Sequence, residues 1–441
     1  MLKVFIILSF CLVFGVHAQI SNVKEGFGPG KQDWGYIKVR RSSQMFWWLF
    51  YVNSQNKSDN LNVYEKPLLI WLQGGPGDSA TGFGNFVEIG PLNVDLKPRI
   101  HSWVNEYNVL FIDNPIGTGF SDEESEQDVK LSDKQITVDL IQFMKNFLEI
   151  KPKFLNTPVY VLGESYGGKM AANFVWGWWE YQQNTSNKIN LKGIALCSPW
   201  ISPVDSLRAL PPYLYNLGLL DNMEYKEIKN LTKYTINAIN ENDWLTAYNL
   251  WNTTIRRSII IINHRNMYNI LKISAPLVKA RDYTTSSIPL CTNETVDWAT
   301  KLERLMNTKV KRTLNLNNFN RTWKIITWSV YKKLKNDIMK PTTLTVNRIL
   351  EETNLKVFVL SGQLDFIVPT TGTLRWVENL KWNSIKHWKN ATKISISVDN
   401  VVEGYVKEYD KFKFFWISRA GHMLPEDNPK AMIAVLKDLT S

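Results

Sequence analysis

The chain has 441 residues, of which 44% are hydrophobic and 21% are charged, and its formal net charge is +11. These values are close to those of soluble globular proteins and exclude a collagen-like or largely disordered chain. The length predicts about three domains, or one large domain with an insertion. The basic residues are dispersed and form no nucleic-acid-binding module, so we expect no nucleic acid partner.

The first eighteen residues predict a secretory signal peptide. Lys3 precedes an apolar run from Val4 to Val16, and residues 16–18 resemble a cleavage site. The run is too short to span a bilayer, and no later run is long enough. We therefore expect a protein of the secretory pathway, secreted or lysosomal, with no membrane span. A signal anchor is the alternative.

Residues that the secretory pathway modifies are frequent in the chain. Seven sequons predict glycosylation on surface loops, at Asn56, Asn184, Asn230, Asn252, Asn293, Asn320 and Asn390. Once the signal is removed, Cys197 and Cys291 remain, and they either form one disulfide or leave Cys197 buried at the end of an apolar run. No group of Cys and His has metal-ligand spacing, so we expect no metal and no cofactor.

Strand-like runs alternate with helical patterns over most of the chain. Predicted strands cover residues 35–39, 45–52, 67–72, 107–113, 158–163, 191–196, 356–360 and 412–417, and predicted helices cover residues 132–147, 169–180, 371–380 and 428–439. This alternation predicts an α/β protein with a mostly parallel sheet flanked by helices. Residues 206–334 are poor in strand-like runs, so we expect a helical cap insertion there. It would separate two parts of one core, residues 19–205 and 335–441.

The sharpest local motif is G-x-S-x-G at residues 163–167. It follows a predicted strand and precedes a predicted helix, which is the context that a nucleophilic serine needs. A sharp turn between strand and helix exposes the serine hydroxyl and points backbone N–H groups at the reaction centre. We therefore predict that Ser165 is a nucleophile.

A nucleophilic serine needs a base and an orienting carboxylate. His422 follows the last predicted strand directly and is the candidate base, whereas the other histidines of the mature chain lie elsewhere: His101, His264 and His387. Asp365 follows the strand at 356–360, with Asp399 and Asp410 as weaker alternatives. The order Ser165, Asp365, His422 is the order found in α/β-hydrolases, so the sequence predicts the α/β-hydrolase fold.

An oxyanion hole requires backbone N–H groups close to the nucleophile. One is that of Tyr166, the residue after the serine, and the other belongs to the glycine-rich loop at 73–77, for which Gly75 is the candidate. Glycines in this loop allow the backbone to approach a substrate closely.

Six segments together resemble the serine carboxypeptidase family that includes carboxypeptidase Y and cathepsin A. They are WLQGGPG (71–77), EIGP (88–91), DNPIGTGFS (113–121), GESYGG (163–168), GQLDFIV (362–368) and AGHMLP (420–425). The resemblance implies an exopeptidase that removes one C-terminal residue from peptides or proteins. It also implies that the substrate carboxylate is bound by Trp71, Gln73, Gly74, Glu88 and Glu164, with one proton shared between the two glutamates.

Two positions depart from the family pattern. The usual Asn before Gly-Gly is Gln73, which is longer by one methylene, and the usual Cys or Gly after the GGPG motif is Asp78, which adds a charge near the site. The glutamate pair must keep its proton and His422 must lose its own, so we expect an acidic pH optimum. Two alternative functions stay open. One is an acyltransferase and the other is a weakly catalytic protective or binding protein. A homodimer is an open expectation for the oligomeric state.

Overall fold

The computed structural model describes residues 24–53, 62–123, 131–185, 188–273 and 293–441. The predicted signal peptide lies outside these residues, as do Asn56 and Cys291. No helix in the described ranges is long and apolar enough to cross a membrane.

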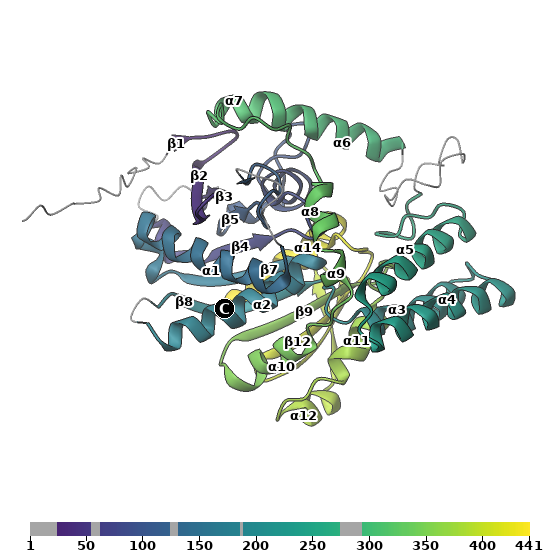
Figure 1. The fold of residues 1–441 in the computed structure, drawn as a ribbon. Helices are drawn as coiled ribbons and strands as arrows, with labels where there is room; N and C mark the ends of the chain where they lie inside the picture. Colours follow the sequence, from purple (N-terminus) through teal and green to yellow (C-terminus); the bar gives the residue numbers. More distant parts are fainter. Residues whose placement is uncertain (1–23, 54–61, 124–130, 186–187, 274–292) are drawn as a thin grey trace, which may run out of the picture.

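One twelve-stranded sheet runs through the molecule (Figure 1). Its spatial order is β1-β2-β3-β5-β4-β7-β8-β9-β12-β11-β10, and β6 pairs with β3 off this path. The six central strands from β5 to β12 pair in parallel, while the strands at both edges are antiparallel. In chain order the strands are Lys24–Glu25, Lys31–Arg40, Ser43–Phe50, Leu68–Leu72, Asn108–Ile112, Asp122–Glu123, Pro158–Glu164, Asn190–Cys197, Lys356–Gly362, Lys393–Val398, Val401–Tyr409 and Phe412–Ile417.

Apolar clusters lie on both faces of the sheet, which explains why its central strands are buried along their whole length. β4 and β5 are buried at every position, as parallel strands covered on both sides must be. One face packs against α1 (Asp133–Ile150), α2 (Tyr166–Gln183), α10 (Thr343–Glu352) and α11 (Thr370–Glu378). The other face packs against α14 (Pro429–Thr440) and the π-helix η2 (Ala80–Ile89).

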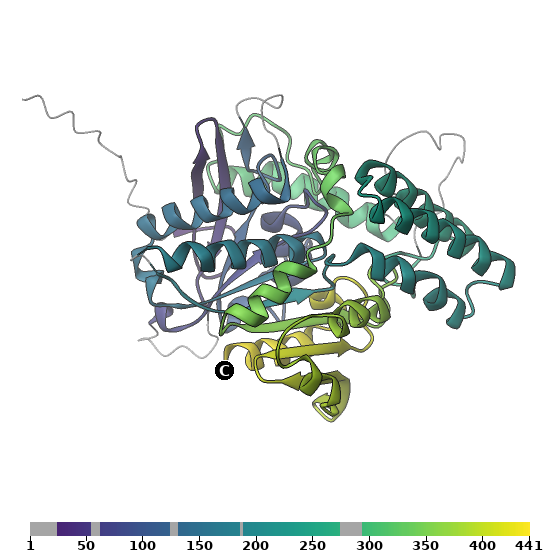
Figure 2. The same ribbon diagram turned by 60° about the horizontal axis from the view of Figure 1, so that its bottom comes forward.

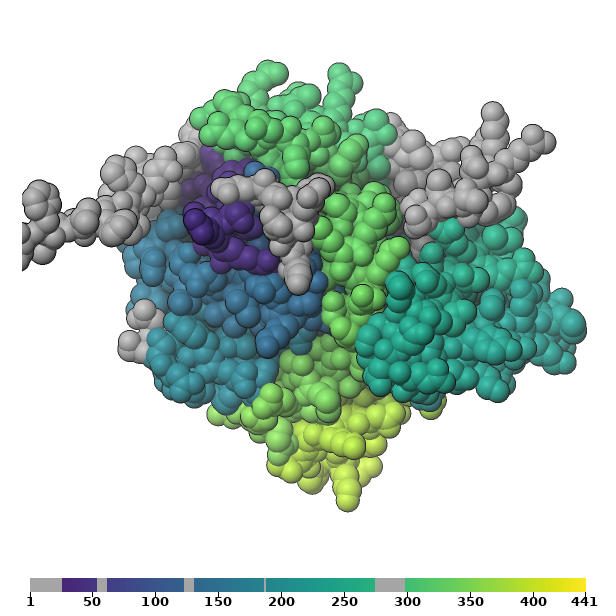
Figure 3. Space-filling model, viewed as in Figure 1, coloured from purple at the N-terminus to yellow at the C-terminus, as the bar shows by residue number. Residues whose placement is uncertain are grey.

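Helices fill the described chain between β8 and β9. The first three, α3 to α5, form a group that projects from one side of the core (teal in Figure 2). Residues after 293 lie between this group and the rest of the core on the face drawn in Figure 3. The bounds are Pro203–Asn216, Asn222–Asn240 and Trp244–Ile261 for α3 to α5, Asn293–Leu305 for α6, Met306–Val310 for the π-helix η5, and Lys311–Thr313, Trp328–Lys333 and Lys335–Ile338 for α7 to α9. The division into a core and a cap stays a prediction.

Short elements complete the chain. They are the 3-10 helices η1 (Val63–Glu65), η3 (Trp103–Asn105) and η4 (Pro152–Leu155), and the helices α12 (Ile385–Asn390) and α13 (Leu424–Asp427).

The sequence analysis expected the sequons on surface loops, but some of them lie on helices. Asn230 and Asn252 lie inside α4 and α5, and Asn390 ends α12. Asn184, Asn230, Asn320 and Asn390 are exposed, Asn252 is half-buried, and Asn293 is the first residue of α6. Cys197 is a free, buried cysteine at the end of β8, in keeping with the second alternative for this residue.

Candidate active site

The predicted nucleophile lies in a sharp turn between the central strand β7 and α2. Ser165 has φ 58° and ψ −124°, a conformation that costs a non-glycine residue about 1–3 kcal/mol. Two backbone hydrogen bonds hold the turn: Ser165 N–H donates to the carbonyl of Cys197 (3.0 Å), and Trp200 N–H donates to the carbonyl of Ser165 (2.9 Å). The strained backbone is therefore fixed from the neighbouring strand.

Glycines allow this turn to pack against the loop after β4. A Cβ atom at Gly74 would lie 2.8 Å from Cβ of Ser165, and one at Gly167 would collide with the carbonyl of Leu72. Because real Cβ atoms do not approach so closely, these two positions exclude side chains. The motif glycines thus bring residues 73–75 directly against the serine.

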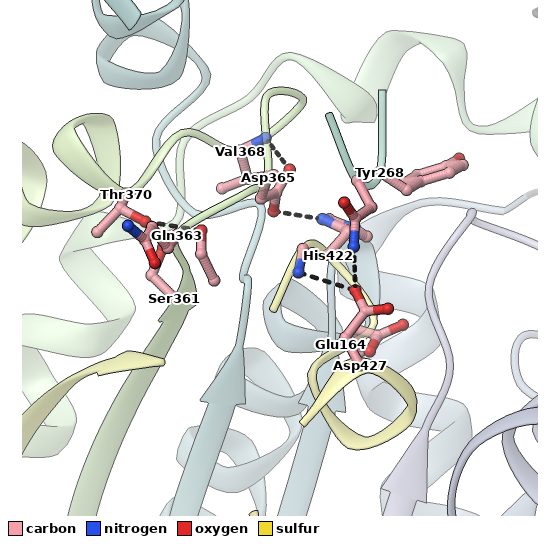
Figure 4. Close-up of polar contacts among 12 residues, drawn as sticks. Glu164, Tyr268, Ser361, Gln363, Asp365, Val368, Thr370, His422 and Asp427 are labelled. Atoms are coloured by element: carbon pink, nitrogen blue, oxygen red, sulfur yellow. Dashed lines mark hydrogen bonds and ion pairs between the residues drawn. The ribbon is translucent and has the colours of Figure 1, made fainter. Parts of the chain in front are cut away.

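Asp365 and His422 form a buried pair (Figure 4). Oδ2 of Asp365 lies 2.7 Å from Nδ1 of His422, and Oδ1 accepts a hydrogen bond from Val368 N–H at 2.9 Å. Burial raises the pKa of Asp365, while His422 and the backbone hydrogen bonds oppose that shift. The histidine backbone donates to the carbonyl of Tyr268 at 2.6 Å, which fixes the ring position further.

The third contact of a triad is not formed in this structure. Nε2 of His422 is buried and has no hydrogen-bond partner among the described residues, so Ser165 is not hydrogen-bonded to it. The two halves are nevertheless close, because Asp365 acts electrostatically on Glu164, the residue before the serine. The sequence alternatives lie elsewhere: Asp399 and Asp410 occupy turns at the two ends of β11.

The two candidate oxyanion donors border the same pocket as Ser165. Gly75 lies in the loop after β4 with φ 102°, and Tyr166 is the first residue of α2. The Tyr166 side chain is anchored elsewhere, because its hydroxyl donates to Asp133 at 2.5 Å. Only the backbone N–H of Tyr166 is therefore available to the reaction centre.

Gln73 joins two buried carboxyl groups beside the serine. Its Oε1 accepts a hydrogen bond from Trp71 Nε1 at 2.6 Å. Its Nε2 donates to Oε1 of Glu88 at 2.9 Å and to Oε1 of Glu164 at 3.0 Å. Since the indole can only donate, it fixes which end of the amide faces the acids. We call Gln73, Glu88 and Glu164 the carboxyl cluster.

Both acids of the carboxyl cluster hold protons more tightly than free glutamates. Burial raises the pKa of Glu88 to about 8. Burial also raises the pKa of Glu164 well above its usual value, and the neighbouring Glu88 adds to the shift. Oε2 of each glutamate is buried without a hydrogen-bond partner in the described part of the chain. Two acids in such contact cannot easily both be ionised, so near neutrality the pair retains a proton.

The helix η2 carries Glu88 and is held in place by Asp113 at the end of β5. The Asp113 carboxylate accepts hydrogen bonds from both hydroxyls near the start of η2, Ser79 (2.7 Å) and Thr81 (2.8 Å). A Cβ at Gly84, inside η2, would lie 2.6 Å from Trp71 Nε1 and 2.7 Å from Gln73 Oε1. The helix can therefore approach the cluster only because residue 84 has no side chain.

Sequence reasoning missed a buried lysine next to the nucleophile turn. Lys169 on α2 pairs with Asp133 at 2.8 Å and donates to the carbonyls of Asp337 (2.5 Å) and Lys340 (2.8 Å). Burial lowers the pKa of Lys169, and Asp133 opposes that shift. Its only sequence signal is a charged residue at a position where a buried helix face should be apolar.

A pocket opens beside Ser165 with about 690 Å³ of empty space, including its mouth. The loop residues Gly75 and Asp78 line one side, and aromatic side chains line much of the rest: Trp200, Tyr248, Trp251, Tyr268, Trp328 and Tyr331. The pocket therefore combines the predicted nucleophile, an aromatic wall and one carboxylate. Among the described residues, no group of His, Cys, Asp and Glu could hold a metal ion.

Comparison with known proteins gives one consistent result. Residues 24–441 match a family model described as serine carboxypeptidase. The chain is 35% identical to the retinoid-inducible serine carboxypeptidase of Mus musculus, over 99% of this chain and 96% of that protein. The identity to the Homo sapiens protein of that name is also 35%, over 93% and 92%.

A solved structure has the same fold. It is that of KEX1(delta)p, a prohormone-processing carboxypeptidase from Saccharomyces cerevisiae, with a TM-score of 0.79 and 24% identity over 95% of this chain and 93% of that one. Together with the observed strand order, this confirms the predicted α/β-hydrolase fold.

Proposed function

The chain belongs to the serine carboxypeptidase family, and we propose on that premise that it removes single C-terminal residues from peptides through Ser165, His422 and Asp365. The observation that carries this proposal is the carboxyl cluster beside the nucleophile turn. A protonated acid pair with two unused oxygens is suited to hold the substrate's α-carboxylate, which only the C-terminus of a peptide provides.

In the proposed reaction Ser165 attacks the last peptide bond. His422 takes the serine proton on Nε2, and Asp365 holds the ring through Nδ1 and stabilises the imidazolium that forms. The N–H groups of Gly75 and Tyr166 stabilise the oxyanion. The same histidine then gives the proton to the leaving amine, and water releases the acyl group from the serine by the reverse steps.

The carboxyl cluster sets where cleavage occurs. Glu164 precedes Ser165, so a carboxylate hydrogen-bonded to it lies within one residue of the bond under attack. A protonated glutamate donates a hydrogen bond to that carboxylate, whereas an ionised one repels it. The neighbouring Gln73 amide remains a donor at every pH, so it supports the same anion while it orients both acids.

The two protonation demands predict a bell-shaped pH profile whose optimum lies below about pH 8. Substrate binding weakens as pH rises past about 8, the raised pKa of Glu88. The rate falls at low pH, because a protonated His422 cannot accept the serine proton. With the sequence signal at residues 1–18, this favours an enzyme of the secretory pathway, secreted or lysosomal.

Blocked dipeptides test the proposal. Purified mature protein is assayed with N-benzoyl-Phe-Leu and with its C-terminal amide, alongside Ser165→Ala. We expect release of leucine from the free acid, much slower release from the amide, and a loss of about 10⁴–10⁶ in kcat for the variant. Equal cleavage of acid and amide would contradict the exopeptidase assignment, and full activity of Ser165→Ala would remove that residue as nucleophile.

A further inference from the structure

One carboxylate in the active-site pocket has no side-chain partner in the part of the chain that the structure describes. Asp78 follows the loop at residues 75–77 and borders the pocket together with Ser165. Its backbone N–H donates to the carbonyl of Gly74 at 3.2 Å, which fixes the residue at this edge. Its side chain makes no ion pair and no hydrogen bond with any of the described residues, whereas Asp365 in the same site has two hydrogen bonds.

Much of the pocket that Asp78 borders is aromatic. Seven Trp and Tyr residues line it, and an aromatic face attracts a cation through the ring quadrupole. A carboxylate among aromatic faces is an arrangement that suits a positively charged side chain with an apolar stem. A purely apolar side chain would leave the Asp78 charge buried against it, which is unfavourable.

The charges around the pocket agree with this. His422 is the group that acts electrostatically on Asp78, and Asp78 in turn acts on Tyr331. Among the described residues, no lysine or arginine lines the pocket. Two cations act on the lining residue Tyr248: Lys335 Nζ lies 5.1 Å from its ring centroid, and Arg256 acts electrostatically on its hydroxyl.

We propose that Asp78 makes this pocket a subsite for a cationic side chain, that of arginine or lysine at the penultimate position of the peptide. The inference rests on the proposed carboxypeptidase activity and adds a preference to it. The penultimate position is inferred from the residues that line the pocket, because they include Ser165 and Gly75 but no member of the carboxyl cluster. The C-terminal residue is held at that cluster, so the residue on the acyl side of the bond faces the pocket.

The preference depends on pH with a sign that can be worked out. Burial raises the pKa of Asp78 to about 7, and His422 opposes the shift. Below that value the carboxyl group is neutral and attracts a cation weakly. The preference for a cation therefore increases as pH rises through about 7, whereas binding at the carboxyl cluster weakens in the same direction.

A matched pair of peptides measures the preference. Arginine and citrulline have nearly the same shape, but only arginine is charged, so N-benzoyl-Arg-Leu and N-benzoyl-citrulline-Leu are compared with purified mature protein. We expect kcat/KM to favour the arginine peptide by about 10-fold at pH 7.5, by analogy with a partly desolvated ion pair, and by less at pH 5. Both peptides use the same histidine and the same carboxyl cluster. Other effects of pH therefore cancel in the ratio of their kcat/KM values.

Three variants locate the source of the ratio. Asp78→Asn should bring the arginine-to-citrulline ratio of kcat/KM close to one at both pH values, and Asp78→Glu should retain it. Glu88→Gln should change KM for both peptides alike and leave this ratio unchanged. A ratio near one in the unsubstituted protein, or a ratio unchanged in Asp78→Asn, would overturn the proposal. In either case hydrolysis of the citrulline peptide would leave the carboxypeptidase function standing. Failure of both peptides, equal to that of Ser165→Ala, would instead overturn the function itself.

Discussion

The site contains two pairs of buried groups. Each pair includes a carboxyl group that is shielded from solvent. Asp365 faces a histidine, which opposes the effect of burial on the pKa of the acid. Glu88 faces a second glutamate, so burial and the neighbouring acid act together on Glu164. The partner, rather than the acid, thus decides whether a buried carboxyl is suited to remain an anion or to keep its proton.

The difference also separates the two tasks. In the proposed mechanism the anion of Asp365 orients the base and stabilises its charged form, so its loss should affect the chemical step. The protonated pair would donate a hydrogen bond to the substrate carboxylate, so its loss should affect binding. Substitutions that convert one kind of pair into the other test this separation.

The largest expected effect is that of Asp365→Asn. An amide at this position accepts or donates at Nδ1 without a charge, so the histidine loses its preferred tautomer and the stabilisation of its cation. We expect kcat to fall by about 10⁴ with KM little changed. Steady-state kinetics with N-benzoyl-Phe-Leu give both numbers, and a rise in KM with kcat retained would place Asp365 in binding instead.

Gly84→Ala should disturb the other pair without touching an acid. The new methyl group would press on Trp71 Nε1 and Gln73 Oε1, and overpacking of this kind costs about 1–3 kcal/mol of stability. We expect a lower melting temperature together with a higher KM. Gly35→Ala is the control, because a Cβ there makes only an ordinary contact with Trp47 at 3.7 Å. Equal effects of the two substitutions would show that η2 has room to move.

Glu164→Gln sharpens the contrast through pH. In the unsubstituted protein KM for a free-acid peptide should rise as pH increases, because the shared proton leaves and the ionised pair repels the substrate. The glutamine keeps a neutral donor, so the rise should become flatter, with a difference of about 10-fold near pH 8.5. The amidated peptide should show little of this rise in either protein. An unchanged KM profile for the acid would place carboxylate recognition outside the cluster.

The smallest expected effect is on stability. The pKa of Glu88 is raised from 4.5 to about 8 in the folded protein, so the folded state binds protons more tightly than the unfolded state. This contribution is fully present below about pH 4.5 and is lost as pH rises through about 8. The melting temperature of Glu88→Gln should therefore decline less between pH 5 and pH 8, by about 2–4 °C. A parallel decline in both proteins, measured by calorimetry, would mean that Glu88 is already ionised.

Sequence patterns predicted the parts of the molecule that are local in the chain. The run before residue 163 is apolar and the segment after it is helical, so the turn at Ser165 could be located from a few residues. The edge hairpin of β10 and β11 escaped because most of its residues are exposed or half-buried and give no strong alternation. The helix η2 escaped because it is a π-helix, and the small residues Ala80, Gly82 and Gly84 interrupt its apolar pattern.

The sequence predicted which residues form the candidate site better than it predicted the contacts between them. The family resemblance named Glu88 and Gln73, but the double donation of one amide to two acids depends on packing between β4, β7 and η2. The bond between Asp365 and His422 was expected from their order in the chain, and the open Nε2 was not. Lys169 and Asp113 were missed because their partners lie far away in sequence, where no short-range pattern reaches.

Lys169 has a consequence for the order in which the protein is made. Its ammonium group binds carbonyls that lie 168 and 171 residues later in the chain. Lys169 is therefore synthesised long before these two partners. Until then the helix behind the nucleophile carries a charge with two of its three contacts missing. In a chain that stops before residue 337, Lys169 therefore lacks two of its three partners. The contacts that surround the charge on α2 are complete only once residue 340 has been made.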